Sequence, residues 1–349
     1  MIGDNVVIDA VAHPFDNSPE NLEVPQDHNN PLLWVKDEEF ALTKAEKLTD
    51  FPAYATAHAL FAESNVDMAM LHALPRFSFT RGPFTDLHKV AAMRDRWPHR
   101  FKLYGTIDTM DTGEAIRSLE YQVNTLHIDG LKLYPVIRYQ DKMHGWKMDD
   151  PDFAMPLFEA AYELGIRNIG IHKIIPVGAG LDYFKVGDIE APLDRWPDMY
   201  FHCVHAGYSF LEEFKILMQM YPNLYANLEN TAAFAVLRPR VFAEIIGEMM
   251  YFGSVNQICF GSGINLLHPH PPLEALARFE MPDDLVRDRG YAPVTAADRA
   301  LMIGGNIARA HGIDLTQVPG TIAGDEFEVI KRDGLKAPWS GLRESTVPV

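Results

Sequence analysis

The segment AIRSLEYQVNTLHIDGLKL, residues Ala115–Leu133, joins a helical pattern to a short strand pattern and decides the fold class. Its first part places Ile116, Leu119 and Val123 on one side of a helix, because residues three, four and seven apart share a helical face. The apolar run at 130–133 then has the length and composition of a buried strand. Such a unit is typical of parallel sheets, whose strands are joined by helical crossovers.

The same unit recurs on both sides of this segment. Short β-branched or aromatic apolar runs predict eight strands, at residues 5–9, 66–71, 101–106, 130–133, 167–171, 199–204, 224–227 and 257–260. Helical periodicity predicts helices at residues 115–126, 156–164, 210–220, 239–250 and 296–312. Eight strands alternating with helices favour an α/β fold closed into a (β/α)8 barrel over an open, doubly wound sheet.

Composition and charge exclude several classes of protein. The 349 residues are 47% hydrophobic and 23% charged, and the 24 Gly and 24 Pro follow no period, which excludes collagen, coiled coils and disorder. A formal net charge of -17 repels phosphate backbones and anionic lipids, so we expect no nucleic-acid and no membrane partner. Cys203 and Cys259 form no disulfide framework, and no signal peptide or apolar stretch of about 20 residues is present. These features predict a soluble, cytoplasmic protein.

No linker or shift in composition divides the chain, so we expect a single barrel over residues 1–314. The segment 14–46 is rich in Asp, Asn and Pro and is too long for an ordinary connection after the first strand. We expect it to form a lid or a partner surface. Residues 315–349 have no strong periodicity and are expected to be a C-terminal extension that wraps a neighbouring subunit.

Histidines gather at the carboxyl ends of the predicted strands, which meet at one mouth of a barrel. They are His13, His72, His172, His202, His205, His268 and His270. Imidazole is a common ligand of zinc, iron and manganese. We predict that His13, His172 and His205 bind one metal ion, with His202 as an additional ligand. A regular strand would instead turn His202 away from His205 and pack it under a helix. Whether His72, His268 and His270 join the site is left open.

Lys132 and Glu229 lie at the ends of two further predicted strands. At the mouth, Lys132 would pair with Glu229 or Asp9 or receive an anionic substrate, whereas the alternative is a solvated lysine that only caps its strand. Glu229 would complete a mixed nitrogen and oxygen metal site, and the alternative is a surface cap. We therefore predict catalytic roles for both residues. Aromatic walls of a dry pocket would come from the neighbourhoods of Phe77, Phe79, Phe84 and Trp146.

Several blocks of the chain together resemble one known family. In chain order they are Ile8–His13, Ser118–Pro135, Ile169–Ile174, Val204–Glu213, Tyr221–Glu229, Ile258–Gly263 and Met302–Ile313. They are similar to the amidohydrolase-related proteins, in the branch of aminocarboxymuconate-semialdehyde decarboxylase and the resorcylate-type decarboxylases. The resemblance extends over Val7–Asp314. It implies a distorted TIM barrel, an amidohydrolase-like metal site and enzymatic activity.

The chain departs from this family at three positions of the site. Val11 stands where the family has the first histidine of its opening motif, and Gly263 stands where it has a metal-binding aspartate that handles the proton of the attacking water. Glu229 replaces a small hydroxyl residue. Without the aspartate, metal-assisted hydrolysis lacks its usual general base. The resemblance therefore implies an altered metal site.

One branch that the chain resembles is formed by the components of isobutylamine N-hydroxylase. This resemblance favours a non-haem iron or iron/manganese amine hydroxylase that activates O2, or one subunit of it, with an amine substrate. Iron or manganese is then the expected divalent metal, and zinc is the alternative. Two further hypotheses remain. One is a metal-dependent hydrolase or non-oxidative decarboxylase of a small carboxylate, which Lys132 or Arg76 would bind. The other is an inactive partner subunit. A homo-oligomer or a hetero-oligomer with a related barrel subunit is expected.

Overall fold

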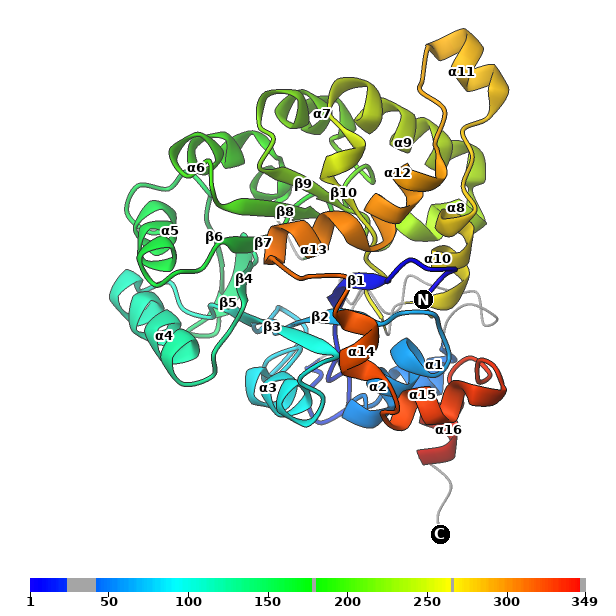
Figure 1. Ribbon diagram of the computed structural model, residues 1–349. Helices are drawn as coiled ribbons and strands as arrows, with labels where there is room; N and C mark the ends of the chain where they lie inside the picture. The colour runs from blue at the N-terminus through cyan, green and yellow to red at the C-terminus, as the bar shows by residue number, and fades with distance from the viewer. Residues whose placement is uncertain (24–41, 178–179, 265–266, 346–349) are drawn as a thin grey trace.

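The computed structural model describes residues 1–23, 42–177, 180–264 and 267–345. Eight parallel strands form one sheet in the order β1-β2-β3-β4-β7-β8-β9-β10, with helices around its outside (Figure 1). These strands are β1 (Ile8–Ala12), β2 (Met68–His72), β3 (Phe101–Thr106), β4 (Gly130–Leu133), β7 (Asn168–His172), β8 (Tyr200–Val204), β9 (Leu224–Asn227) and β10 (Ile258–Cys259).

The two edges of this sheet meet and nearly close a barrel. The Ala10 amide donates to the Phe260 carbonyl at 3.0 Å, and the Gly263 amide donates to the Val11 carbonyl at 3.0 Å. Side chains on both faces of the strands are buried, because the interior and the surrounding helices each cover one face. The predicted α/β class and distorted (β/α)8 barrel are confirmed.

The helices are α1 (Lys44–Lys47), α2 (Ala53–Phe61), α3 (Leu87–Arg96), α4 (Thr112–Asn124), α5 (Ala154–Glu163), α6 (Glu190–Arg195), α7 (Leu211–Met220), α8 (Phe234–Leu237), α9 (Pro239–Phe252), α10 (His270–Ala277), α11 (Asp283–Arg289), α12 (Ala296–Ala300), α13 (Asn306–His311), α14 (Val318–Ile322), α15 (Glu326–Ile330) and α16 (Ser340–Ser345). Helix α4 shows how local sequence forms one of them. Asp111 caps its start by accepting the Glu114 amide at 2.8 Å, and Leu119 is buried against the barrel.

Several elements differ from the sequence prediction. Strand β1 lies three residues later than expected, and an antiparallel hairpin of β5 (Val136–Tyr139) and β6 (Lys142–Gly145) follows β4. The predicted helix at 296–312 is divided by a π-helical turn over Leu301–Gly305. This turn brings the backbone against β1, because a Cβ on Gly304 would lie only 2.3 Å from the Val6 carbonyl oxygen. Local periodicity does not contain such a tertiary contact.

The segment after Asp314 forms helices α14, α15 and α16, and α15 and α16 lie beside α2 (Figure 1). Glu63, just beyond α2, accepts hydrogen bonds from the amides of Trp339 at 2.6 Å and Gly341 at 2.8 Å. The described part of this tail therefore packs on its own barrel. The expected lid at 14–46 lies partly outside the described residues, but its first part is joined to the segment after β2 by the Asp16 amide, which donates to the Phe84 carbonyl at 2.8 Å.

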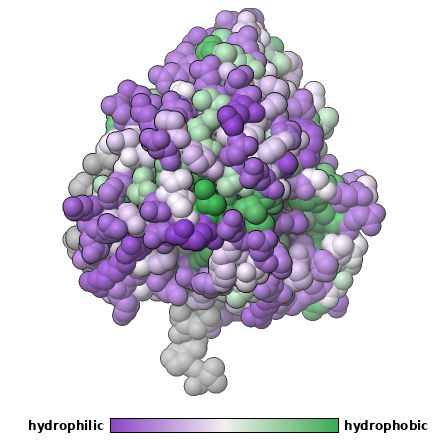
Figure 2. Space-filling view, turned by 90° about the vertical axis from the view of Figure 1, so that its left-hand side faces the viewer, coloured by the Kyte–Doolittle hydropathy of each residue, from purple (hydrophilic) through white to green (hydrophobic). Residues whose placement is uncertain are grey.

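The surface of the described residues is mostly hydrophilic on the face seen in Figure 2, where apolar residues gather near the centre. No helix among the described residues combines the length and the apolar character needed to cross a bilayer.

Candidate active site at the barrel mouth

Four predicted site residues lie together at the carboxyl ends of neighbouring strands. His13 follows β1, His172 ends β7, His205 follows β8 and Glu229 follows β9. Each side chain is almost completely buried, with exposed fractions of 1%, 4%, 3% and 2% in the same order. Because parallel strands all point to one end of a barrel, residues distant in sequence meet there.

These four side chains form a row in which each lies close to the next. His172 Nδ1 and His205 Nε2 lie 3.3 Å apart, and His205 Nε2 lies 3.7 Å from Glu229 Oε2. At the other end, His13 Nε2 lies 3.5 Å from Glu229 Oε1. Two ligand atoms bound tetrahedrally at about 2.1 Å from one ion are roughly 3.4 Å apart. Neighbours in this row therefore already have the spacing of ligands that share a metal.

Backbone carbonyls determine which nitrogen of each imidazole faces inward. A carbonyl only accepts, so His13 Nδ1 donates to the His72 carbonyl at 3.1 Å and His205 Nδ1 donates to the Glu229 carbonyl at 3.1 Å. In the same way, His172 Nε2 donates to the Ile175 carbonyl at 2.8 Å. The remaining nitrogen of each ring faces the shared space.

The inward-facing nitrogens of His172 and His205 and the Oε2 atom of Glu229 are electron-pair acceptors with no donor among the described residues. Burial lowers the pKa of His205 to about 4 and lowers that of His172 well below its usual value, so both rings are neutral near pH 7. Burial alone raises the pKa of Glu229, but the electrostatic interaction with His205 and a hydrogen bond from His13 outweigh it and lower the pKa to about 2. Glu229 Oε2 has no hydrogen-bond partner among the described residues. A bound cation would satisfy this set of acceptors.

The four side chains form a row and do not yet surround a single position. Among the described residues, no three His, Cys, Asp or Glu side chains are already arranged to hold one ion. The distances between neighbouring side chains fit metal coordination. His172 and His13 stand at opposite ends of the row, however, and they must approach each other before all four side chains can share one metal ion.

The backbone at these strand ends is strained. His205, Asn230 and Ile174 have φ values of 64°, 60° and 77°, in the left-handed region that non-glycine residues seldom adopt. Such residues cost about 1–3 kcal/mol each and concentrate at functional sites. At His205 this conformation turns the imidazole into the mouth.

Lys132 lies in the barrel interior and is completely buried. Its ammonium group has no hydrogen-bond partner among the described residues and lies 5.3 Å from the centre of the Tyr134 ring. Burial lowers the pKa of Lys132 to about 8, although the charge of Glu229 acts in the opposite direction. The alternative of a solvated, strand-capping lysine is therefore wrong.

The expected ion pair of Lys132 with Glu229 or Asp9 is also absent from the described residues. Asp9 instead accepts the Ser262 amide at 2.9 Å and the Val11 amide at 3.1 Å, which joins the first and last strands. Burial raises the pKa of Asp9 to about 7.

A small apolar cavity of about 30 Å³ adjoins His172, His205 and Glu229. Its other walls are mainly the side chains of Phe15, Leu74, Phe77, Phe79, Phe84, Tyr134, Ile175 and Val177. Three of the four predicted aromatic wall residues are thus in place. Trp146 is not, because it packs edge-on against Phe153 in the main core.

Sequence reasoning missed Phe15, whose ring stacks between His13 and Phe84 with centroid distances of 5.1 and 4.4 Å. The signal was present, since Phe15 is two residues from His13. What its neighbours would be depended on the segment after β2.

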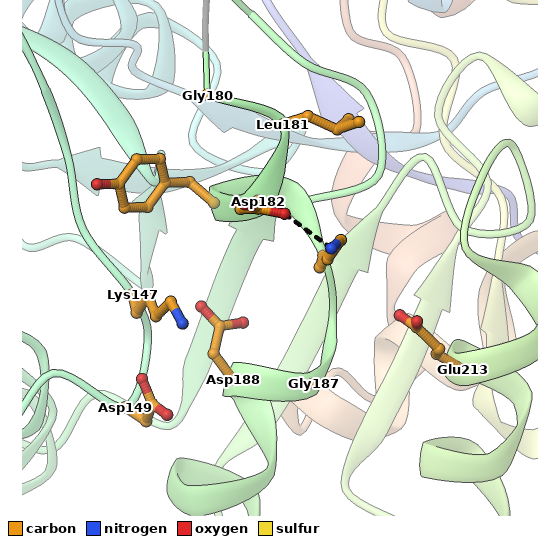
Figure 3. A pocket seen from close by; sticks show the side chains of 10 residues that line it. Lys147, Asp149, Gly180, Leu181, Asp182, Gly187, Asp188 and Glu213 are labelled. Carbon is orange, nitrogen blue, oxygen red and sulfur yellow. Dashed lines mark ion pairs between the residues drawn. The ribbon is translucent and has the colours of Figure 1, made fainter.

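A larger pocket of about 1040 Å³ lies among the loops outside the barrel interior (Figure 3). Two of its carboxylates are already paired: Asp182 lies 2.7 Å from Lys185, and Asp188 lies 2.6 Å from the buried Lys173. It contains none of the four clustered residues. We therefore place the candidate active site at the small cavity.

Comparison with known proteins identifies the family of the chain. The family model described as amidohydrolase matches residues 8–313. The chain belongs to the amidohydrolase family. No curated protein sequence gives a significant match.

Solved structures share the barrel of this amidohydrolase at low sequence identity. An uncharacterised TIM-barrel protein from Bordetella bronchiseptica has 17% identity and a TM-score of 0.63, over 88% of this chain and 98% of the other. A 5-carboxyvanillate decarboxylase from Novosphingobium aromaticivorans, with bound manganese and 3-methoxy-4-hydroxy-5-nitrobenzoic acid, has 13% identity and a TM-score of 0.53, over 88% and 97%. A 2,6-dihydroxybenzoate decarboxylase complexed with 2,6-dihydroxybenzoate has 13% identity and a TM-score of 0.53, over 89% and 99%. At these identities the likeness establishes the fold.

Other histidines of the barrel lie outside the row of four clustered side chains. His72 presents its carbonyl to His13, while its ring stacks on Tyr104 at 4.2 Å and both ring nitrogens lack partners among the described residues. His202 Nε2 contacts Asn168 Oδ1 at 2.9 Å, near the start of β7. His202 therefore points into the barrel but away from its mouth, and the structure does not bring it to the predicted metal ligands.

The sequence did not decide whether His268 and His270 belong to the metal site. In the structure both lie away from the barrel mouth. His268 Nε2 donates to Glu63 Oε2 at 2.9 Å, and the His270 amide donates to His268 Nδ1 at 3.2 Å. His58, a second partner of Glu63, contacts Oε1 through Nδ1 at 2.8 Å and is only 4% exposed. These residues hold the C-terminal tail in place.

Proposed function

We propose that this amidohydrolase is a metal-dependent, non-oxidative decarboxylase of a small aromatic carboxylate. The observation that carries the proposal is the convergence of His13, His172, His205 and Glu229 at the mouth. There the inward-facing nitrogens of His172 and His205 and the Oε2 atom of Glu229 have no donor among the described residues. These residues would hold one divalent ion. When bound, such an ion acts as a Lewis acid that polarises a carboxylate or an adjacent hydroxyl oxygen.

Charge supports a carboxylate substrate. A divalent ion, the Glu229 carboxylate and the Lys132 ammonium together leave two positive charges in a nearly dry interior, where an uncompensated charge is costly. An anionic substrate would reduce that excess. The buried ammonium of Lys132 has no hydrogen-bond partner among the described residues, so its N–H groups are left to donate to such a substrate. Arg76, on the segment after β2, is the alternative cation.

Shape supports an aromatic ring. Phe15, Phe77, Phe79, Phe84 and Tyr134 surround the cavity next to the polar cluster, so they would hold the flat face of a ring and exclude water. The cavity of about 30 Å³ is small, so binding of a ring requires these side chains to move apart. In the reaction, the bond between the ring carbon and its carboxyl group breaks, CO2 leaves, the electron pair stays on the ring carbon, and that carbon takes a proton that comes from solvent.

The decarboxylases similar in fold, which bind aromatic carboxylates, also favour this reaction over amine hydroxylation. Hydrolysis is less favoured because Asp9 already accepts hydrogen bonds from Ser262 and Val11, and because we propose Glu229 as a metal ligand and not as a general base. We propose manganese or zinc as the metal. Iron, which the amine hydroxylase hypothesis requires, is the alternative.

The test uses protein loaded separately with Mn²⁺, Zn²⁺ or Fe²⁺ and a panel of hydroxybenzoates, benzamides, esters and small amines, with and without O2. We expect CO2 release from a hydroxybenzoate without O2, with one solvent deuterium incorporated at the vacated carbon in D2O. The His172→Ala and His205→Ala variants should lose bound metal and activity, and the exposed His88→Ala should retain both. O2 uptake tied to amine consumption, or faster turnover of an amide or ester, would overturn the proposal.

A further inference from the structure

The carboxylate of Glu229 rests against the bare α-carbon of Gly263. A Cβ placed on Gly263 would lie 2.6 Å from Glu229 Oε1, 2.7 Å from Cγ and 3.0 Å from Cδ. Real Cβ atoms do not approach other atoms so closely. The space beside residue 263 is therefore already filled by the side chain of residue 229, which comes from the neighbouring strand.

A second glycine extends the same contact. A Cβ on Gly261 would lie 2.4 Å from Asn227 Oδ1 and 3.3 Å from the Glu229 amide nitrogen. Asn227 Oδ1 in turn accepts the Glu229 amide at 3.1 Å. Gly261 and Gly263 thus form a bare surface along which the segment from Asn227 to Glu229 lies.

The residue between the two glycines fixes this surface to the barrel. Ser262 donates its amide to Asp9 Oδ1 at 2.9 Å, and Gly263 donates its amide to the Val11 carbonyl at 3.0 Å. With a φ of 60°, Gly263 adopts a conformation that glycine enters freely and that Asp or Asn tolerates better than most residues. The glycine surface therefore cannot retreat from Glu229 without opening the junction of β10 with β1.

We propose that Gly261 and Gly263 are positioning residues that seat Glu229, and that the mouth has room for one carboxylate, supplied either from position 229 or from position 263. An aspartate at 263 would carry its carboxylate one bond beyond a Cβ that already overlaps the Glu229 carboxylate. The two positions are therefore mutually exclusive and interchangeable. The metal readout of this inference rests on the proposed function, whereas its folding readout does not.

The test is a double-mutant cycle of Glu229→Ser, Gly263→Asp and the double variant. We expect each single variant to bind Mn²⁺ or Zn²⁺ at least about tenfold more weakly than the unmodified protein, because one lacks the carboxylate and the other displaces it. The double variant should recover most of the affinity. Gly320→Ala, at a glycine with open space around it, is the matched control and should change nothing.

A second readout is independent of metal. Gly263→Ala should lower the midpoint of thermal unfolding of the metal-free protein, and the loss should be clearly smaller when Glu229 is already Ser, since the overlapping side chain is then gone. Equal losses in both backgrounds, or a double variant that binds metal no better than its parents, would overturn the inference. If the unmodified protein binds no metal, the proposed function fails, and the folding cycle still decides whether Gly263 seats Glu229.

Discussion

Two buried clusters of one glutamate with histidines differ in their balance of hydrogen-bond donors and acceptors. Glu63 accepts five hydrogen bonds, from His58, His268, Ser340 and the amides of Trp339 and Gly341. The side chain of Glu229 instead faces ring nitrogens whose opposite nitrogens already donate to carbonyls. The same residue types thus form a saturated structural cluster around Glu63, whereas around Glu229 the Oε2 atom has no hydrogen-bond partner among the described residues. We call the second group the unsatisfied cluster.

This difference separates two uses of a buried carboxylate. Satisfied polar groups stabilise the fold and leave nothing for a ligand, whereas unsatisfied acceptors cost stability unless a cation binds. The pKa does not distinguish the clusters. Burial raises the pKa of Glu63, but hydrogen bonds from His268 and His58 outweigh it, so both glutamates have a pKa of about 2.

The largest expected effect compares the two glutamates directly. Glu229→Gln removes the charge that faces the ring nitrogens and should weaken metal binding by more than about 100-fold, since even outer partners of metal ligands are worth 10–100-fold. Glu63→Gln should leave metal affinity unchanged but lower the free energy of unfolding by about 3 kcal/mol, because it replaces a carboxylate that accepts five donors. Metal titration and chemical denaturation of both variants measure this. A similar profile for the two variants would contradict the distinction.

Exchanging histidine for glutamine sharpens the comparison. Glutamine retains an N–H donor but has no nitrogen lone pair. His268→Gln should therefore keep its bond to Glu63 and cost no more than about 1 kcal/mol, whereas His205→Gln should bind metal at least about 100-fold more weakly. Calorimetry with and without Mn²⁺ gives both values. Strong metal binding by His205→Gln would remove it from the ligand set.

Lys132 belongs with the unsatisfied cluster, so its replacement should separate stability from activity. Lys132→Met keeps the volume and removes a buried, unpaired charge, which is expected to raise the free energy of unfolding by about 1–3 kcal/mol. If Lys132 binds the substrate carboxylate, the same change should raise the free-energy barrier for kcat/KM by about 2–5 kcal/mol. A variant that is less stable and fully active would show that the ammonium has a structural partner and no role in substrate binding.

The smallest effect concerns acid. The pKa of Glu63 falls from 4.5 to about 2 on folding, so its contribution is fully present above pH 4.5 and is lost as the pH falls toward 2. The shift in the pKa of Glu63 corresponds to about 3 kcal/mol of folding stability. Hydrogen bonds that the cluster still makes after Glu63 is protonated would retain part of this stability. The difference in unfolding free energy between the unmodified protein and Glu63→Gln should therefore shrink between pH 5 and pH 2. A constant difference across this range would mean that Glu63 is not the titrating group.

The sequence by itself predicted much of the fold and part of the site. The strands at 101–106, 130–133 and 224–227 have the predicted bounds, and His13, His172 and His205 meet at the mouth as expected. This succeeds because hydrophobic periodicity locates strand ends, and the ends of parallel strands in a closed barrel converge whatever their separation in sequence.

Only the tertiary structure decided what each polar residue does. His268 and His205 are both histidines beyond a strand, yet His268 is saturated by Glu63, which is 205 residues away in the chain. His202 lies on a predicted strand but contacts Asn168, away from the mouth. The close contact of Glu229 with Gly263 likewise depends on two different strands lying side by side. Local sequence determines where a side chain leaves the backbone, because periodicity is a property of the chain. Which donors and acceptors surround that side chain depends on residues far apart in sequence, and this balance separates a ligand from a structural residue.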